Sequence, residues 1–200
     1  YRRQRQMCIR DSLCEAPYGG SAKFGKTEFA AMTPRQISAT VGYLGHDPEL
    51  SADTVQNNVL CGSEQDAMPW LAAAALDDEV LAMENGVDTV IGPSGTRLSG
   101  GQAQRLALAR TLAHPRPVLI LDEATSSIDT RTEALVQRGM DGLMYGRTSF
   151  VIAHRLSTVR NADCIVVLEQ GRIIERGSHD ELIAKKGKYY QLYTGNLAEN

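Results

Sequence analysis

The stretch "LSGGQAQRLALARTLAHPRPVLILDEATSSID", Leu98–Asp129, decides the fold because a helix, a buried strand and two acidic residues follow one another in it. Ser99 can cap a helix rich in Ala and Leu that we expect to run to Ala113, and Pro115 prevents its continuation. Val118–Leu121 is an uninterrupted apolar run, typical of a strand buried on both faces of a parallel sheet. The stretch therefore predicts an α/β fold.

The start of this helix has the composition of a phosphate site. Gly100 and Gly101 would be costly in a helix interior, but in the first turn they let a ligand approach the backbone amides closely. A helix N-terminus carries about half a positive charge and unpaired N–H groups, which suit a phosphate. A helix start softened by glycine, with no ligand, is the alternative interpretation.

Two strand ends carry residues suited to chemistry on a phosphate. Asp122 and Glu123 follow the buried strand at its carboxyl end, the edge where open parallel sheets place their ligands. An Asp there can bind Mg²⁺, usually through water, and the adjacent Glu can polarise an attacking water; a solvated strand end with two acids is the alternative. A second predicted strand, Thr148–Ala153, ends in His154, whose ring N–H could bond a γ-phosphate and hold that water in line.

A different stretch, "GSAKFGKT" at Gly20–Thr27, matches the phosphate-loop pattern G-x-x-x-x-G-K-[ST]. A working loop of this kind needs a strand entering it and a sustained helix leaving it. A proline and a glycine stand where the strand should be, and we expect Pro34 to end any following helix after about two turns. Phe24 instead suits a short strand and Gly25-Lys26 a turn, so we predict a hairpin and a coincidental match.

Composition excludes several classes of function. The 24 acidic residues nearly balance 21 Lys and Arg, which gives no support for a nucleic-acid partner or a membrane-surface role. A hydrophobic fraction of 42% is ordinary for a globular α/β protein, and no apolar run approaches the length of about 18 residues that spans a bilayer. The cysteines form no C-x-x-C pair, so we interpret them as reduced, buried or incidental thiols: Cys8, Cys14, Cys61 and Cys164.

The beginning of the chain is unusual. The first twelve residues, "YRRQRQMCIRDS", start at Tyr1 and contain four arginines without periodicity. A basic arm for nucleic acid is one interpretation, but nothing after it is basic. We expect residues 1–12 to be a non-native leader and residues 13–200 to be a partial domain whose upstream portion is missing.

Three motifs in order, "LSGGQ", "VLILDEATSSID" and "SFVIAHRLST", resemble the nucleotide-binding domain of ATP-binding cassette (ABC) transporters, most closely the exporter subgroup. The likeness extends from about Gly20 to about Thr194. It implies an α/β, P-loop NTPase-like ABC ATPase core, here partial, with a helical signature subdomain over about residues 54–98. It also places the phosphate loop before residue 1.

The resemblance implies a role for each matching residue. The signature motif, which would contact the γ-phosphate of ATP held by an opposing subunit, is Ser99, Gly100, Gly101 and Gln102. The residues expected around the catalytic water are Asp122 as the Mg²⁺-associated acid, Glu123 as the general base, His154 as the switch histidine, and Ser127 and Asp129 in a loop that crosses the dimer interface.

Two segments depart from the family pattern. In "GYLGHD", His46 replaces the usual glutamine of the loop that joins the two lobes. An imidazole ligates Mg²⁺ poorly and only when neutral, so we expect altered metal coordination or coupling there. The segment "TVIGPSG", Thr89–Gly95, matches the exporter segment that senses the membrane domain, with Pro93 and Ser94 in place of an acidic–basic pair.

The resemblance implies the ATP-hydrolysing domain of an ABC exporter, with ATP and Mg²⁺ as cofactors, at the cytoplasmic face of the cell membrane. Its partners would be a second nucleotide-binding domain, identical or not, and a transmembrane domain, fused upstream or separate. A non-catalytic fragment that only dimerises or complements a partner is one alternative. A soluble ABC ATPase of DNA repair or translation is another.

The remaining segments give further local predictions. Asp66–Met83 should form short helices, and a helix should run from Thr130 to about Leu143. Apolar runs on both sides of Gln170-Gly171 predict a hairpin, and Ser178 should cap another helix. The tyrosines of "YYQLY" have a spacing that favours packing of a terminal helix over base stacking.

Overall fold

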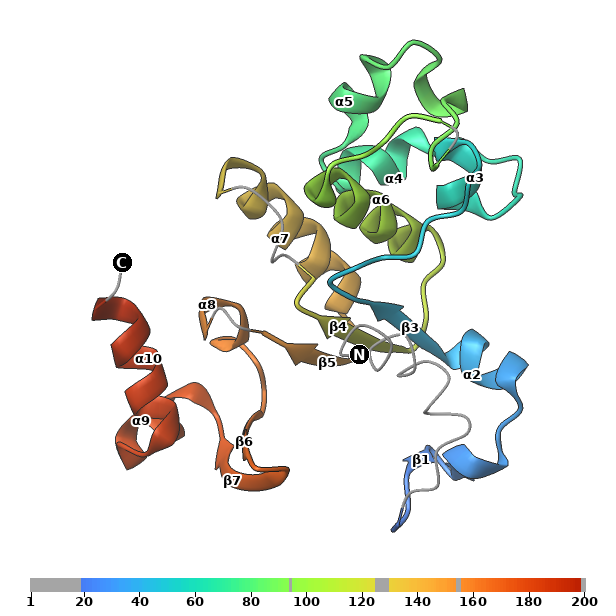
Figure 1. The fold of residues 1–200 in the computed structure, drawn as a ribbon. Helices are drawn as coiled ribbons and strands as arrows, with labels where there is room; N and C mark the ends of the chain where they lie inside the picture. Colours follow the sequence, from blue (N-terminus) through green and yellow to red (C-terminus); the bar gives the residue numbers. More distant parts are fainter. Residues whose placement is uncertain (1–18, 94, 125–129, 154–155, 199–200) are drawn as a thin grey trace. The chain divides into compact units, whose positions relative to one another are not determined.

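The computed structural model of the chain describes residues 19–93, 95–124, 130–153 and 156–198 (Figure 1). The chain divides into two compact units, one ending at Phe150 and the other beginning at Val151. The first unit holds the predicted helix start and the two acids, and the second is a smaller β-hairpin and helix unit.

A three-stranded sheet has the order β3-β4-β5, with β3 at Val41–Leu44, β4 at Val118–Asp122 and β5 at Thr148–Ile152. Strands β3 and β4 and the first three residues of β5 belong to the first unit. Strands β3 and β4 are parallel, and Leu44 lies opposite Leu121. Leu119 and Leu121 are fully buried, as expected for a central strand. The predicted strands are confirmed, except that β4 continues to Asp122 and β5 ends one residue early.

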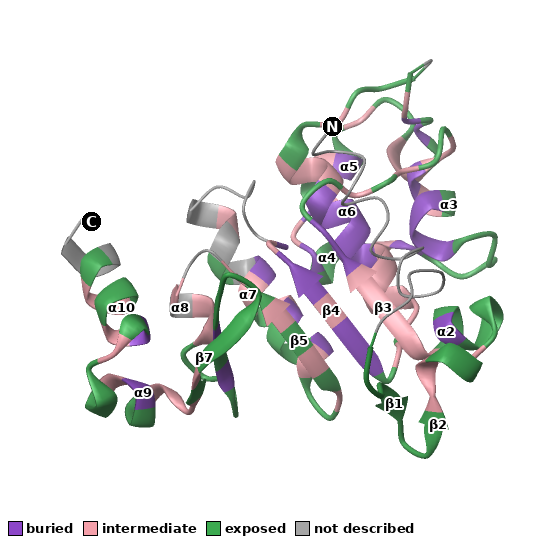
Figure 2. Ribbon diagram, turned by 60° about the horizontal axis from the view of Figure 1, so that its bottom comes forward, coloured by how far each residue is buried: buried purple, intermediate pink, exposed green. Residues whose placement is uncertain are grey.

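Helix α6, Gly100–Ala113, confirms the helix predicted after Ser99. It contacts β3 as well as helices α3 (Val55–Leu60), α4 (Met68–Ala73) and α7 (Thr130–Met144). Leu106, Ala107, Leu108 and Ala109 are consecutive and all buried, because α6 lies between the sheet and the small helices (Figures 1 and 2). Its polar first turn is left at the surface.

Short helices fill the segment before α6. The prediction for Asp66–Met83 is confirmed by α4 and by α5, Asp77–Leu81, and a 3-10 helix, η2, follows at Gly86–Asp88. Helix α3 was not predicted, although Thr54 caps it by accepting from the amide of Asn57. The extent of a helical subdomain over residues 54–98 stays a prediction.

The stretch with the phosphate-loop spelling forms a hairpin, as predicted. Strand β1, Lys23–Phe24, pairs antiparallel with β2, Thr27–Glu28, and Gly25 in the turn has a φ of +59°. A 3-10 helix, η1, follows at Phe29–Ala31. No strand or sustained helix flanks this hairpin among residues 19–31.

Within the described residues, no helix that follows Thr27 continues through Pro34, as expected, but this proline begins a helix that was not predicted. Helix α2, Pro34–Thr40, is capped by a reciprocal pair of hydrogen bonds between Thr33 and Gln36. Proline is tolerated at the first helical position since its missing N–H would have no intrahelical acceptor there. The Thr-Pro-x-Gln pattern was the available signal.

The second unit consists of a hairpin packed on helices. Strands β6, Ile165–Glu169, and β7, Arg172–Gly177, are antiparallel, and Gln170 and Gly171 both have positive φ in the predicted turn. Helices α8, α9 and α10 span Leu156–Val159, His179–Lys185 and Lys188–Ala198. The capping box predicted at Ser178 is confirmed, and Tyr189 lies in the core with Ile165, Val167 and Leu182. Tyr189 therefore packs the terminal helix, as predicted.

Two compositional expectations can be compared with the described residues. No helix among them is both long and apolar enough for a membrane span. Cys61 and Cys164 carry free thiols, and both are exposed rather than buried. Cys8 and Cys14 lie outside the described residues.

We predict that Leu119→Ala lowers the free energy of unfolding by about 2–5 kcal/mol, because Leu119 is fully buried in β4 and its removal leaves a cavity. Urea denaturation followed by circular dichroism measures the change. Leu81→Ala in α5 is the matched control, since Leu81 is 64% exposed. Equal losses in the two variants would contradict the central place of β4.

Candidate functional site

Asp122 ends strand β4 and is held by the neighbouring strand. Its side chain is buried, and its Oδ2 accepts a hydrogen bond from the Tyr43 hydroxyl at 3.3 Å. Burial, then the charge of Asp122 and this hydrogen bond, raise the pKa of Tyr43 to about 12. Tyr43 is therefore a permanent donor at neutral pH, and it orients the carboxylate.

Glu123 follows in an unusual backbone conformation. Its φ is +52°, in the left-handed region, where a residue with a side chain costs on the order of 1–2 kcal/mol. Its carbonyl accepts from Nε2 of Gln104 at 3.4 Å. Strain of this kind is concentrated at functional sites, because the surrounding structure must hold it in place.

Gln104 also reaches the loop that follows β3. Its Nε2 donates to the carbonyl of His46 at 3.2 Å. Because β3 and β4 are parallel, the loops after both strands leave the sheet at the same edge. The structure thus brings His46, Asp122 and Glu123 together at this edge, as the sequence predicted for the two acids. The His46 side chain is 45% exposed, with its Nε2 4.0 Å from Asp47 Oδ1.

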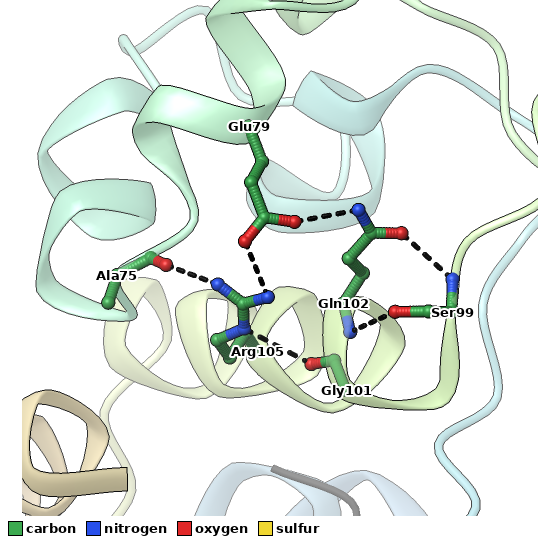
Figure 3. Close-up of polar contacts among 6 residues, drawn as sticks. All are labelled: Ala75, Glu79, Ser99, Gly101, Gln102 and Arg105. Carbon is green, nitrogen blue, oxygen red and sulfur yellow. Dashed lines mark hydrogen bonds and ion pairs between the residues drawn. The ribbon is translucent and has the colours of Figure 1, made fainter. Parts of the chain in front are cut away.

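The start of α6 is an ordered and exposed helix N-terminus. Ser99 Oγ accepts a hydrogen bond from the backbone N–H of Gln102 at 3.2 Å. In return, Gln102 Oε1 accepts one from the backbone N–H of Ser99 at 2.8 Å (Figure 3). Ser99 and Gly100 are exposed, while Gly101 and Gln102 are half-buried. The amides of the first turn have no acceptor within the helix and suit an anion.

A buried arginine ties this helix start to α5. Glu79 accepts from Gln102 Nε2 at 2.7 Å through one carboxylate oxygen and pairs with Arg105 at 2.7 Å through the other. The Arg105 side chain is 7% exposed and also donates to the carbonyls of Gly101 and Ala75 (Figure 3). The guanidinium charge is therefore neutralised and satisfied, and Gln102 is fixed from two sides.

Sequence reasoning missed Glu79 and Arg105. Arg105, which directly precedes the apolar stretch Leu106–Ala109, was the available signal, because a buried arginine requires a partner. Nothing in the sequence identified Glu79 as that partner among the acids of α5, which also include Asp77 and Asp78.

The chain is similar to a protein-family model, to a solved structure and to curated proteins. A family model described as "ABC transporter" matches residues 12–126, more than half of the chain. The chain belongs to the ABC transporter family. The predicted ABC ATPase fold is confirmed by a solved protein, described as a bacterial Atm1-family ABC exporter with ATP bound. That structure matches with a TM-score of 0.86 and 33% identity over 98% of this chain and 35% of the other.

Several similar curated proteins carry the name ATP-dependent lipid A-core flippase. The ATP-dependent lipid A-core flippase of Syntrophus aciditrophicus (strain SB) is 44% identical over 207 residues, which cover 90% of this chain and 34% of that protein. The protein of the same name from Hahella chejuensis (strain KCTC 2396) is 51% identical over 152 residues, covering 74% and 26%. The chain thus spans about a quarter to a third of the length of these two relatives.

Three predicted site residues of this ABC chain, Ser127, Asp129 and His154, lie outside the described residues. Their roles stay predictions. Lys26, the lysine of the stretch that matches the phosphate-loop pattern, lies in an exposed hairpin turn rather than at a helix N-terminus. In this hairpin the stretch lacks the converging amides that hold phosphates.

The acids fit magnesium only in part. Within the described ranges there is no group of three or more His, Cys, Asp or Glu that could hold a metal ion. Mg²⁺ bound to a nucleotide commonly uses one or two carboxylates together with phosphate oxygens and water, and Asp122 can supply one such oxygen. His46 offers an imidazole, which is a poor ligand for this hard cation.

We predict that Lys26→Ala leaves the affinity for Mg-ATP unchanged within about 2-fold, because Lys26 lies in the hairpin turn. Lys23→Ala in the adjoining strand is the matched control, and titration calorimetry measures both variants of the full-length protein. A loss of more than about 10-fold with Lys26→Ala alone would show that the stretch holds phosphate.

We predict that Glu79→Ala lowers the free energy of unfolding by about 1–3 kcal/mol, because it leaves the buried Arg105 unpaired while Glu79 itself is partly exposed. Urea denaturation of this variant is compared with that of Glu84→Ala, which removes an exposed carboxylate nearby. Pairing Glu79→Leu with Arg105→Met should recover part of the loss. Equal stability of the two alanine variants would refute the role of the ion pair.

Proposed function

We propose that this chain is the ATP-binding and ATP-hydrolysing domain of an ABC exporter, and that it couples hydrolysis to transport across a membrane. The observation that carries the proposal is the meeting of Asp122, Glu123 and the loop of His46 at one sheet edge. The likeness to lipid A-core flippases and to an Atm1-family exporter with ATP bound supports it. These relatives do not favour a soluble ABC ATPase of DNA repair.

Residues at the start of α6 would bind the γ-phosphate of ATP held by a second nucleotide-binding domain. The amides of Gly100 and Gly101 point along the helix axis at its positive end. Ser99 Oγ accepts from the Gln102 amide and keeps its own proton to donate to a phosphate oxygen. Gln102 is already engaged with Ser99 and Glu79, so its side chain shapes the loop.

Asp122 would hold Mg²⁺ directly or through water. When bound, Mg²⁺ would neutralise charge on the phosphates. Tyr43 donates to Oδ2 and fixes the rotation of the carboxylate, which leaves its other oxygen for the metal shell. The imidazole of His46 would contribute no strong ligand here, so its loop would act mainly through its backbone.

Glu123 would act as the general base that takes a proton from the attacking water. A positioned base of this kind typically contributes about 10²–10⁴ in rate. His154 would hold the water in line with the γ-phosphate, and Ser127 and Asp129 would line the interface with the second domain. These three roles rest on the family resemblance alone.

The proposed partners follow from the proposed exporter function. A second nucleotide-binding domain, identical or different, would supply the opposing half of each ATP site. A transmembrane domain, fused or separate, would use the resulting closure for transport, with this domain at the cytoplasmic face of the membrane. No nucleic-acid partner is proposed, since the charge balance does not favour one.

We predict that Glu123→Gln, in the full-length protein, lowers ATP turnover by about 10²-fold or more while preserving ATP-bound dimers, because the amide cannot accept the proton. Phosphate release measures turnover, and size-exclusion chromatography with ATP measures dimers. Glu64→Gln, at an exposed site, is the control. Normal hydrolysis by Glu123→Gln would refute the assignment of the base.

A further inference from the structure

Gln104 is a buried polar residue of α6 that lies between Ala103 and the buried Arg105. It is 1% exposed and lies one helical turn after Gly100. Burying an amide is costly unless its groups find hydrogen-bond partners. A leucine at this position would fill the space without that requirement, so the amide needs an explanation.

The amide of Gln104 bridges two loops that are distant in sequence. Nε2 lies 3.2 Å from the carbonyl of His46, which is 58 residues away, and 3.4 Å from the carbonyl of Glu123, which is 19 residues away. A side-chain NH₂ group carries two hydrogens, so it can serve both carbonyls at once. The amide thus links the loops that leave β3 and β4.

We propose that Gln104 is a positioning residue for Glu123, and that it sets where the base meets the attacking water. Glu123 has a φ of +52°, which its surroundings must impose because a residue with a side chain avoids this region. The hydrogen bond from Gln104 holds the backbone carbonyl of Glu123, the residue with the strained φ. Without that bond, the peptide after Glu123 can rotate and carry the carboxylate away.

The position of Gln104 on α6 gives the contact a second consequence. Ser99 to Gln102, which we propose to meet a γ-phosphate, form the start of the same helix. Gln104 lies less than two turns after Ser99. A rigid helix moves as one body, so a shift of its start also shifts the amide at Glu123. Gln104 therefore couples phosphate contact at one site to the readiness of the base at the other. This inference rests on the proposed function.

The test is Gln104→Met in the full-length protein, since methionine keeps the length of the side chain and removes both donors. We expect kcat for ATP hydrolysis to fall about 10–100-fold and the KM for ATP to change less than about 3-fold. Gln137→Met in α7 is the matched control, because the side-chain amide of Gln137 donates to Asp141 within the same helix. Both kcat and KM should stay unchanged in this variant. Unchanged kcat, or a change in KM alone, would overturn the proposal.

A double-mutant cycle separates positioning from general structural damage. In a Glu123→Gln background, Gln104→Met should lower the residual single-turnover rate less than about 2-fold, since no base remains to be positioned. Full additivity of the two changes would assign Gln104 a structural role and overturn the inference, while the proposed function would stand. Normal turnover by Glu123→Gln alone would instead overturn both. If Gln104→Met fails to fold, Gln104→Glu, which keeps the shape and loses the NH₂ group, takes its place with the same outcomes.

Discussion

Parallel pairing of β3 with β4 is the constraint on which the described site depends. It brings the loops after both strands to one edge of the sheet, although they are separated by more than seventy residues in sequence. In this register Leu44 lies opposite Leu121, and residues on both faces of β4 are buried. Tyr43 can then reach Asp122, and the His46 loop can come within reach of the loop of Glu123.

Helix α6 supplies the second half of the arrangement through a few buried polar contacts. Its apolar body packs between the sheet and the small helices. Gln104 and Arg105 donate hydrogen bonds to backbone carbonyls of neighbouring segments. Hydrogen bonds to these carbonyls, and for Arg105 the ion pair with Glu79, offset the cost of burying the two side chains. The result is a helix whose first turn is fixed to α5 and whose second turn is fixed to the end of β4.

Much of this was predictable from sequence where local rules act. The cap at Ser99, the buried run Val118–Leu121 and the turn at Gln170-Gly171 each follow from short-range chemistry and are present in the structure. Helix α3 was missed because a six-residue helix carries too little periodicity. The start of α2 at Pro34 was also missed, since proline can begin a helix as well as end one.

Contacts between distant residues could not be predicted in the same way. The partners of Gln104 are backbone carbonyls, which every residue carries, so no sequence pattern marks His46 or Glu123 as its acceptors. The choice of Glu79 over its acidic neighbours likewise depends on how α5 lies against α6. Such contacts follow from packing geometry, and only the structure supplies that geometry.

The left-handed backbone at Glu123 sets stability and turnover against each other at a single position. Glycine would adopt this φ with less steric strain, but it would remove the carboxylate that we propose as the general base. If Glu123 is the base that we propose, the chemistry keeps a strained residue where a glycine would fit the backbone more easily. Mutational drift in an inactive copy of this gene should replace it early.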